Sequence, residues 1–174
     1  PRAQVELIEE FVDEENAGDL IPADAVVLDC IDQVRAKAAM IAAVRRRGQF
    51  IVTSGAAGVR TDPLRIESGD LGRISGDPLL ASVRYRLRKE YGFPKAAPDA
   101  GRPGRPLAPA FRVPCVFSAE PVKKPLGDEA CTIGAGGGAA LACAGYGSGV
   151  VVTAPMGMAV AAIALNEAVR RAQS

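Results

Sequence analysis

Two aspartates follow an apolar run at a place where α/β proteins bind ligands. Residues 25–28 are Ala-Val-Val-Leu, and Asp29 and Asp32 come directly after them. A short apolar run between polar residues is typical of a parallel strand that is buried on both faces. Ligands of open α/β sheets bind outside the carboxyl ends of the strands, where an aspartate can hold Mg²⁺ on a triphosphate. The alternative is that Asp32 only caps the helix that follows.

A second candidate site is the run of small residues at 54–58, Ser-Gly-Ala-Ala-Gly. It follows a predicted strand at residues 50–53, so it also lies just past a strand end. Residues this small let a ligand or another backbone approach closely, and Gly55 is the candidate contact. An ordinary tight loop would use the same residues and is the simpler explanation when the segment is taken alone.

The cysteines and the absence of histidine limit the possible chemistry. None of the four cysteines forms a C-x-x-C pair, so no zinc site is expected, and most of them should be buried, reduced thiols. Cys131 and Cys143 lie among glycines, where a thiol could be exposed and reactive. The chain has no histidine to activate a nucleophile, which favours a structural role for both.

Basic residues gather on the predicted helix at residues 79–91. Arg84, Arg88 and Lys89 could bind nucleic-acid phosphates. Arginines at 84, 86 and 88 cannot all share one helix face, so a solvated face explains them as well. The net charge of +1 does not by itself indicate a nucleic-acid partner.

Two features of the chain resemble known motifs only weakly. Residues 134–139 fit the G-x-G-x-x-A spacing of a dinucleotide loop, but no convincing strand precedes them. Residues 141–166 carry no charge and are long enough to cross a bilayer. Four glycines and Pro155 within them favour a glycine-rich turn and a buried helix instead, so no membrane association is expected.

The remaining pattern predicts one α/β domain over residues 1–174, with a Pro-, Gly- and Arg-rich connection at 94–110. The spacing of apolar residues and the positions of Gly48 and Gly92 predict the element ends. The expected strands are at 4–12, 25–28, 50–53, 64–67 (antiparallel) and 113–118, and the expected helices are at 34–47, 79–91 and 156–171.

Residues 26–37, VVLDCIDQVRAK, resemble the central motif of the ubiquitin-activating-like (HesA, MoeB and ThiF) superfamily. Within it, the chain is most similar to the tRNA threonylcarbamoyladenosine dehydratase family. The likeness extends in family order over most of the chain, through residues 31–48, 52–63, 76–93, 114–120 and 143–165. It implies a Rossmann-like, ThiF-type adenylyltransferase fold whose N-terminal nucleotide-binding part is missing from this chain, which would leave the chain inactive alone.

The resemblance also implies a reaction. ATP would activate the carboxylate of threonylcarbamoyladenosine in tRNA as an acyl-adenylate, and internal attack would close a ring with net loss of water. Asp32 would hold Mg²⁺ on the ATP, and Arg35, Lys37 and Gly55 would complete the cofactor site. One alternative is an adenylyltransferase for the C-terminus of a sulfur-carrier or ubiquitin-like protein; another is a ThiF-like binding domain without catalysis.

The partners implied by the resemblance are tRNA, a second copy of the chain and a cysteine desulfurase or other sulfur-acceptor system. The tRNA would contact Arg84, Arg88 and Lys89. A monovalent cation, Na⁺ or K⁺, is a further cofactor that the family allows. The expected location is the cytoplasm.

Overall fold

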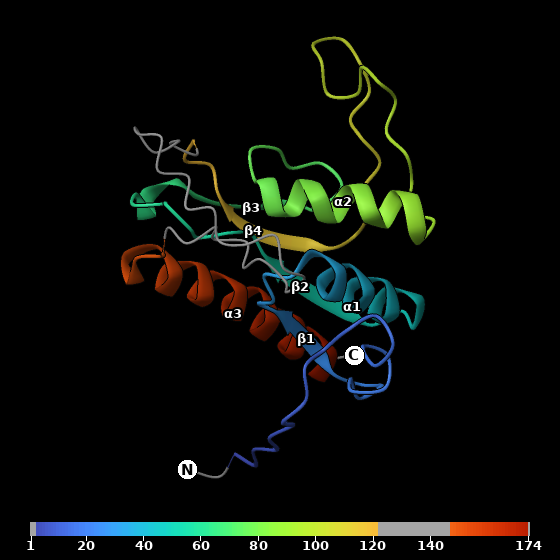
Figure 1. Ribbon diagram of the computed structural model, residues 1–174, viewed down its shortest axis with the longest axis vertical. Helices are drawn as coiled ribbons and strands as arrows, with labels where there is room; N and C mark the ends of the chain where they lie inside the picture. Colours follow the sequence, from blue (N-terminus) through green and yellow to red (C-terminus); the bar gives the residue numbers. More distant parts are fainter. Residues whose placement is uncertain (1–2, 122–146, 174) are drawn as a thin grey trace, which may run out of the picture.

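A four-stranded sheet organises the computed structural model, which describes residues 3–121 and 147–173 (Figure 1). The strands lie in the order β1-β2-β4-β3. Three are parallel, and β3 pairs antiparallel with β4 at one edge. Their bounds are β1 Val26–Asp29, β2 Phe50–Ser54, β3 Ile66–Asp70 and β4 Pro114–Ser118.

Helices cover both faces of this sheet. On one face α1 (Val34–Arg46) and α2 (Pro78–Glu90) pack against each other, and on the opposite face α3 (Val150–Ala172) crosses β1, β2 and β4 (Figure 1). Two separate clusters of buried apolar residues result, a large one under α1 and α2 and a small one under α3. The α/β class predicted from the sequence is confirmed.

Helix α1 shows why the central unit forms where the pattern predicts it. Every residue from 36 to 44 is buried, and five of these nine residues are alanines, which let the helix lie close to the sheet and to α2. The helix ends before Gly48, whose φ of +70° suits a residue without a side chain. The strand–helix–strand prediction for this region is confirmed, with β1 and β2 parallel.

Other element predictions were displaced or wrong. The antiparallel strand begins two residues late, because Pro63–Arg65 forms a 3-10 turn that the Asp62 side chain caps through the Leu64 N–H at 2.9 Å. The strand predicted at 4–12 is wrong: Val5, Leu7 and Phe11 are exposed and no strand forms there. Alternation of apolar residues produces a strand only where a partner strand and a core exist.

The last helix starts six residues earlier than predicted, at Val150, so Pro155 lies inside it. A proline there removes one helical hydrogen bond. The packing of Val152 and Met156 on the sheet outweighs that loss. By length and composition α3 could also cross a membrane, with a mean hydropathy of 1.6. Residues 94–110 form the long loop at the top of Figure 1, without helix or strand.

Candidate functional site

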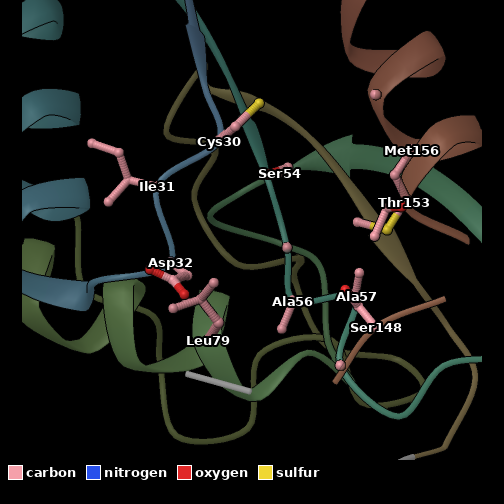
Figure 2. Close-up of a pocket in the computed structure, with 13 residues that line it drawn as sticks. Cys30, Ile31, Asp32, Ser54, Ala56, Ala57, Leu79, Ser148, Thr153 and Met156 are labelled. Atoms are coloured by element: carbon pink, nitrogen blue, oxygen red, sulfur yellow. The ribbon is translucent and has the colours of Figure 1, made fainter. Parts of the chain in front are cut away.

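A pocket lies at the carboxyl edge of the parallel strands, where the sequence predicted a ligand site. Its volume is about 330 Å³. Residues 30–32 after β1 and 54–58 after β2 line one side, and Leu79 of α2 extends that wall. Thr153 and Met156 of α3 lie across the pocket from Asp32 (Figure 2). The two segments that the sequence proposed, the aspartate turn and the small-residue loop, therefore line the same pocket.

A buried ion pair fixes the turn that carries Asp32. The Asp29 carboxylate and the Lys37 ammonium are 3.0 Å apart, and both side chains have no exposed surface. The same carboxylate accepts hydrogen bonds from Thr53 Oγ1 at 2.6 Å and from the Ile31 N–H at 3.0 Å. Lys37 Nζ also donates to the Ile31 carbonyl at 2.7 Å. A buried pair with this many hydrogen bonds holds the backbone of residues 29–31 in one conformation.

A second carboxylate anchors the small-residue loop. Asp77 accepts the Leu80 N–H at 2.8 Å as the N-cap of α2, and it also accepts the Ala56 N–H at 3.0 Å. Gly55 passes so close to this carboxylate that a β-carbon there would collide with Asp77 Oδ2. The loop therefore needs glycine at position 55 for packing against Asp77, in addition to any role toward a ligand.

Asp32 differs from these two anchoring aspartates because it is exposed. Within the described residues its carboxylate accepts no hydrogen bond and forms no ion pair. It does not cap α1 either: the N-cap residue is Gln33, and no side chain caps the first turn. Figure 2 shows Asp32 at the pocket wall beside Leu79. A carboxylate with free oxygens at the lip of a pocket is suited to hold a cation.

Two other predicted cofactor contacts lie elsewhere. Lys37 does not line the pocket, because its ammonium is enclosed beneath the turn and paired with Asp29. Arg35 is exposed on α1 and does not line the pocket either. Of the predicted cofactor residues, the structure brings only Asp32 and Gly55 together at one cavity.

The predicted nucleic-acid residues of α2 are largely occupied within the fold. Arg88 donates to the carbonyls of Pro94 at 3.1 Å and Gly72 at 3.2 Å, and its guanidinium lies 5.2 Å from the centre of the Phe111 ring. Arg84 is half-buried, and burial lowers the pKa of its guanidinium. Lys89 alone of the three predicted contacts is exposed. Arg84 and Arg88 thus have structural roles that the sequence did not reveal.

The cysteines divide between core and pocket. Cys115 is buried in β4, and burial raises the pKa of its thiol to about 12, which suits an inert side chain. Cys30 is exposed and lines the pocket beside the aspartate turn, so the expectation of burial was wrong for it. Cys131, Cys143 and the glycine-rich residues 134–139 lie outside the described residues.

The sequence analysis missed the contribution of α3 to the site. Thr153, Met156 and Gly157 come from the first two turns of this helix, and Ser148 precedes it. The only available signal was that Thr153 interrupts an apolar run. Among the described residues, no group of three or more His, Cys, Asp or Glu side chains gathers as a metal site would require.

Comparisons with known proteins agree with this geometry. No protein-family model matches the chain. It is 36% identical over 159 residues to the tRNA threonylcarbamoyladenosine dehydratase of Haemophilus influenzae, covering 90% of this chain and 56% of that protein. It is 34% identical over 177 residues to the Escherichia coli protein of the same name, covering 99% of this chain and 62% of that protein.

Solved structures match as well. The E. coli tRNA N6-threonylcarbamoyladenosine dehydratase TcdA in complex with AMP superposes with a TM-score of 0.72 and 30% identity, over 95% of this chain and 57% of that one. Its complex with ATP gives a TM-score of 0.70 at the same identity and coverage. The chain thus spans less than two thirds of the length of these relatives.

The parallel sheet, the pocket at its carboxyl edge and the structural matches define the class: a ThiF-type α/β fold, represented in part. Within that class, the resemblance predicted from the sequence is confirmed, and the chain is a relative of the tRNA threonylcarbamoyladenosine dehydratases.

Proposed function

We propose that this protein catalyses the ATP-dependent dehydration of threonylcarbamoyladenosine in tRNA. The observation that carries the proposal is the Asp32 carboxylate, which is exposed at the lip of the pocket and has no partner among the described residues. It stands where α/β sheets bind nucleotides, in a chain similar to a dehydratase solved with AMP and with ATP. The tRNA substrate follows from the names of the relatives.

The pocket offers a carboxylate for the magnesium ion of a bound nucleotide, but its described lining offers no cationic side chain for the phosphates. Mg²⁺ is usually held by one or two carboxylates together with water and phosphate oxygens, and Asp32 offers such a carboxylate. The described residues that line the pocket include no lysine or arginine. A Mg²⁺ ion held by Asp32 would offset part of the phosphate charge, and cationic groups outside this lining would have to offset the rest. A monovalent cation has no identified ligands among the described residues.

In the proposed reaction the substrate carboxylate would displace pyrophosphate from ATP to give an acyl-adenylate, and internal attack on the acyl carbon would expel AMP and close the ring. The residues of this chain would orient the bound substrate and enclose its reacting group. The Asp29–Lys37 pair and the Asp77 carboxylate hold the two pocket loops rigid. Ile31, Leu79 and Met156 line the pocket with apolar surface, which excludes water from an activated acyl group. Because ring closure occurs within one bound substrate, positioning can supply much of the rate.

A second copy of the chain is the proposed partner of α3. Val151, Met158, Leu165 and Val169 are exposed and recur at intervals of seven, seven and four residues, which places them on one side of the helix. The buried residues Val152, Met156, Val160 and Ala164 occupy the opposite side. We call the exposed set the outer stripe. An apolar stripe of this length on a helix is typical of an interface, and symmetric dimers are the commonest assembly.

The remaining proposals depend on the family alone. A cytoplasmic location follows from relatives that modify tRNA, and transfer to a sulfur-acceptor system has no support in the described residues. The alternative of an adenylyltransferase for a protein tail would use the same carboxylate and pocket. The alternative of a binding domain would require that nucleotide binding is lost.

The experiment combines the natural gene product with Mg²⁺–ATP and tRNA that carries threonylcarbamoyladenosine. Digestion and mass spectrometry should reveal the nucleoside that has lost one water. Asp32→Asn, which keeps the side-chain volume but removes the charge, should lower kcat by ~100-fold or more, as loss of a group that stabilises transition-state charge does. The matched control is Asp24→Asn, since Asp24 is an exposed aspartate at the other end of β1.

Three outcomes separate the hypotheses. Product from the wild type and from Asp24→Asn, with almost none from Asp32→Asn, supports the dehydratase function and the role of Asp32. No product, with ATP–pyrophosphate exchange intact, contradicts it in favour of protein-tail activation. Absence of both product and exchange contradicts catalysis and favours a binding domain.

A further inference from the structure

The end of the sheet opposite the pocket carries a hollow that the proposed reaction does not use. Its volume is about 470 Å³, and it lies beside Gln49 and Phe50 at the amino edge of β2. We call it the arginine hollow, because four arginines line it together with a single acid, Glu167: these are Arg45, Arg47, Arg170 and Arg171. We propose that the arginine hollow binds phosphate groups of the tRNA backbone; the inference rests on the proposed function for its choice of nucleic acid.

The hollow is built by two helix ends that are far apart in the sequence. Arg45 and Arg47 stand at the end of α1, and Arg170 and Arg171 at the end of α3. Cations stabilise a helix C-terminus, which explains one or two basic residues on each helix. It does not explain why both basic ends converge on one concave surface from opposite faces of the sheet (Figure 1).

The charge of the hollow is far from balanced. Glu167 accepts hydrogen bonds from Arg170 Nε and Nη2, both at 2.8 Å, and from Arg171 Nε at 2.9 Å. Among the described residues that line the hollow, four arginines stand against one glutamate. The whole chain has a net charge of only +1, so the rest of it is net negative. Positive charge is thus concentrated at the hollow, as at an anion-binding surface.

The guanidinium groups of Arg45 and Arg47 keep N–H donors for a ligand. Arg45 Nη1 donates to the Gln49 carbonyl at 3.3 Å, and Arg47 Nη1 donates to the Ile21 carbonyl at 3.1 Å. Each guanidinium carries five N–H groups, so these single bonds fix the side chains and leave other N–H groups available. A planar fork of N–H donors matches phosphate oxygens, which is why arginine dominates phosphate recognition.

The position of the hollow suits a long, polyanionic substrate better than a small one. Thr153 and Met156 of the pocket and Arg170 of the hollow lie on α3, which at about 1.5 Å per residue places the two sites roughly 20–25 Å apart along this helix. Nucleic-acid strands carry a phosphate about every 3.4 Å of helix axis, so about seven nucleotides cover that distance. One tRNA stem-loop can therefore present its modified base to the pocket and its backbone to the hollow.

The experiment measures the affinity of the natural gene product for tRNA at several salt concentrations. The variant R47Q/R170Q removes two exposed guanidiniums from the hollow. The matched control R65Q/R105Q removes two exposed arginines elsewhere, one of them in the 3-10 turn that contacts α3. The hollow variant should weaken tRNA binding by roughly tenfold, and the slope of log affinity against log salt should become shallower by one to two. The control should change neither.

Further readouts keep the test independent of folding and of the reaction. The variant R47K/R170K preserves charge but not the planar fork, so it should keep the salt slope of the wild type and lose less affinity than R47Q/R170Q. Thermal unfolding should show that both hollow variants remain folded. The KM for ATP should not change. Equal affinity and equal salt slope in wild type and R47Q/R170Q would overturn the proposal. It would also be overturned if R47Q/R170Q reduced only the increase in melting temperature that inorganic phosphate causes and left tRNA binding unchanged. Failure of the dehydratase function would appear separately, as tRNA that is bound but never dehydrated.

Discussion

The two faces of the sheet are covered to very different extents. On one face every residue of α1 from 36 to 44 is buried, because α1 packs against both the sheet and the neighbouring helix α2. On the other face α3 is the only helix among the described residues, and of its 23 residues only Val152, Met156, Val160 and Ala164 are buried. The first face resembles the interior of a finished domain, whereas in the described part of the chain the second is covered by one helix whose outer stripe is apolar and exposed. Stability should therefore concentrate on the first face, and association on the second.

The largest expected effect comes from the ion pair under α1. Lys37→Met leaves the Asp29 carboxylate buried without its counter-ion, and losing one partner of a buried pair costs about 3–5 kcal/mol. The free energy of unfolding, measured with urea, should fall by that amount. Arg35→Met on the same helix is the matched control, because Arg35 is exposed and should cost no more than ~0.5 kcal/mol. A loss below about 1 kcal/mol for Lys37→Met would show that the pair does not anchor this face.

The same substitution made on both faces compares their packing directly. Ile41→Ala in α1 removes a fully buried side chain and should cost about 2–5 kcal/mol. Ile163→Ala in α3 removes a side chain that is only partly buried against the small cluster, and should cost about 1–2 kcal/mol. Unfolding in denaturant measures both changes. Equal losses would mean that α3 is packed as firmly as α1 and would contradict the contrast between the faces.

Local patterns predicted the first face better than the second. The three parallel strands and the length of α1 follow from short-range apolar spacing and from a glycine stop, and the structure confirms these elements. The inward position of Lys37 was not predictable in this way. Lys37 lies eight residues after Asp29, and the two side chains meet only because the turn between β1 and α1 brings the helix back against the end of the strand. The resemblance assigned Lys37 to the cofactor site, whereas its ammonium is paired with Asp29 beneath the turn.

Contacts between residues that are far apart in the chain were also not predictable from the sequence. Arg88 was predicted to contact a nucleic acid, but the carbonyls of Gly72 and Pro94 that accept its hydrogen bonds belong to loops on either side of α2. Arg45 and Arg171 are 126 positions apart and meet only because α1 and α3 end at the same edge of the sheet. No residue spacing encodes that meeting, whereas the resemblance to a family predicted the site through Asp32.

On the second face, charge placed in the outer stripe should separate association from stability. Met158→Glu with Leu165→Glu puts two carboxylates on the proposed dimer interface, where desolvating them is costly. Analytical ultracentrifugation should show dimers for the wild type and monomers for the variant. The free energy of unfolding at low protein concentration should change by no more than ~0.5 kcal/mol per substitution, since both side chains are exposed.

The control for this prediction is Tyr85→Glu, which places one carboxylate at an exposed position of α2 on the first face. It should leave the dimer intact. A wild type that is monomeric at all concentrations, or one that binds lipid vesicles through α3 without dimerising, would contradict the second copy as the occupant of the stripe.

The smallest expected effect is a pH dependence at the end of α3. Hydrogen bonds from Arg170 and Arg171 lower the pKa of Glu167 to about 2, from an ordinary value of 4.5. A carboxyl whose pKa is lowered by folding contributes stability that is complete above the unfolded pKa and is lost as the pH falls toward the folded one. Glu167→Gln should therefore flatten the fall in stability between pH 4.5 and 2, measured by thermal unfolding, while stability at neutral pH decreases slightly. The contribution is small because both arginines are partly exposed and salt screens such pairs.

The same substitution raises the positive charge of the arginine hollow by one, so at neutral pH tRNA binding should tighten as stability declines. Parallel losses in both would show that Glu167 shapes the hollow rather than merely neutralising it.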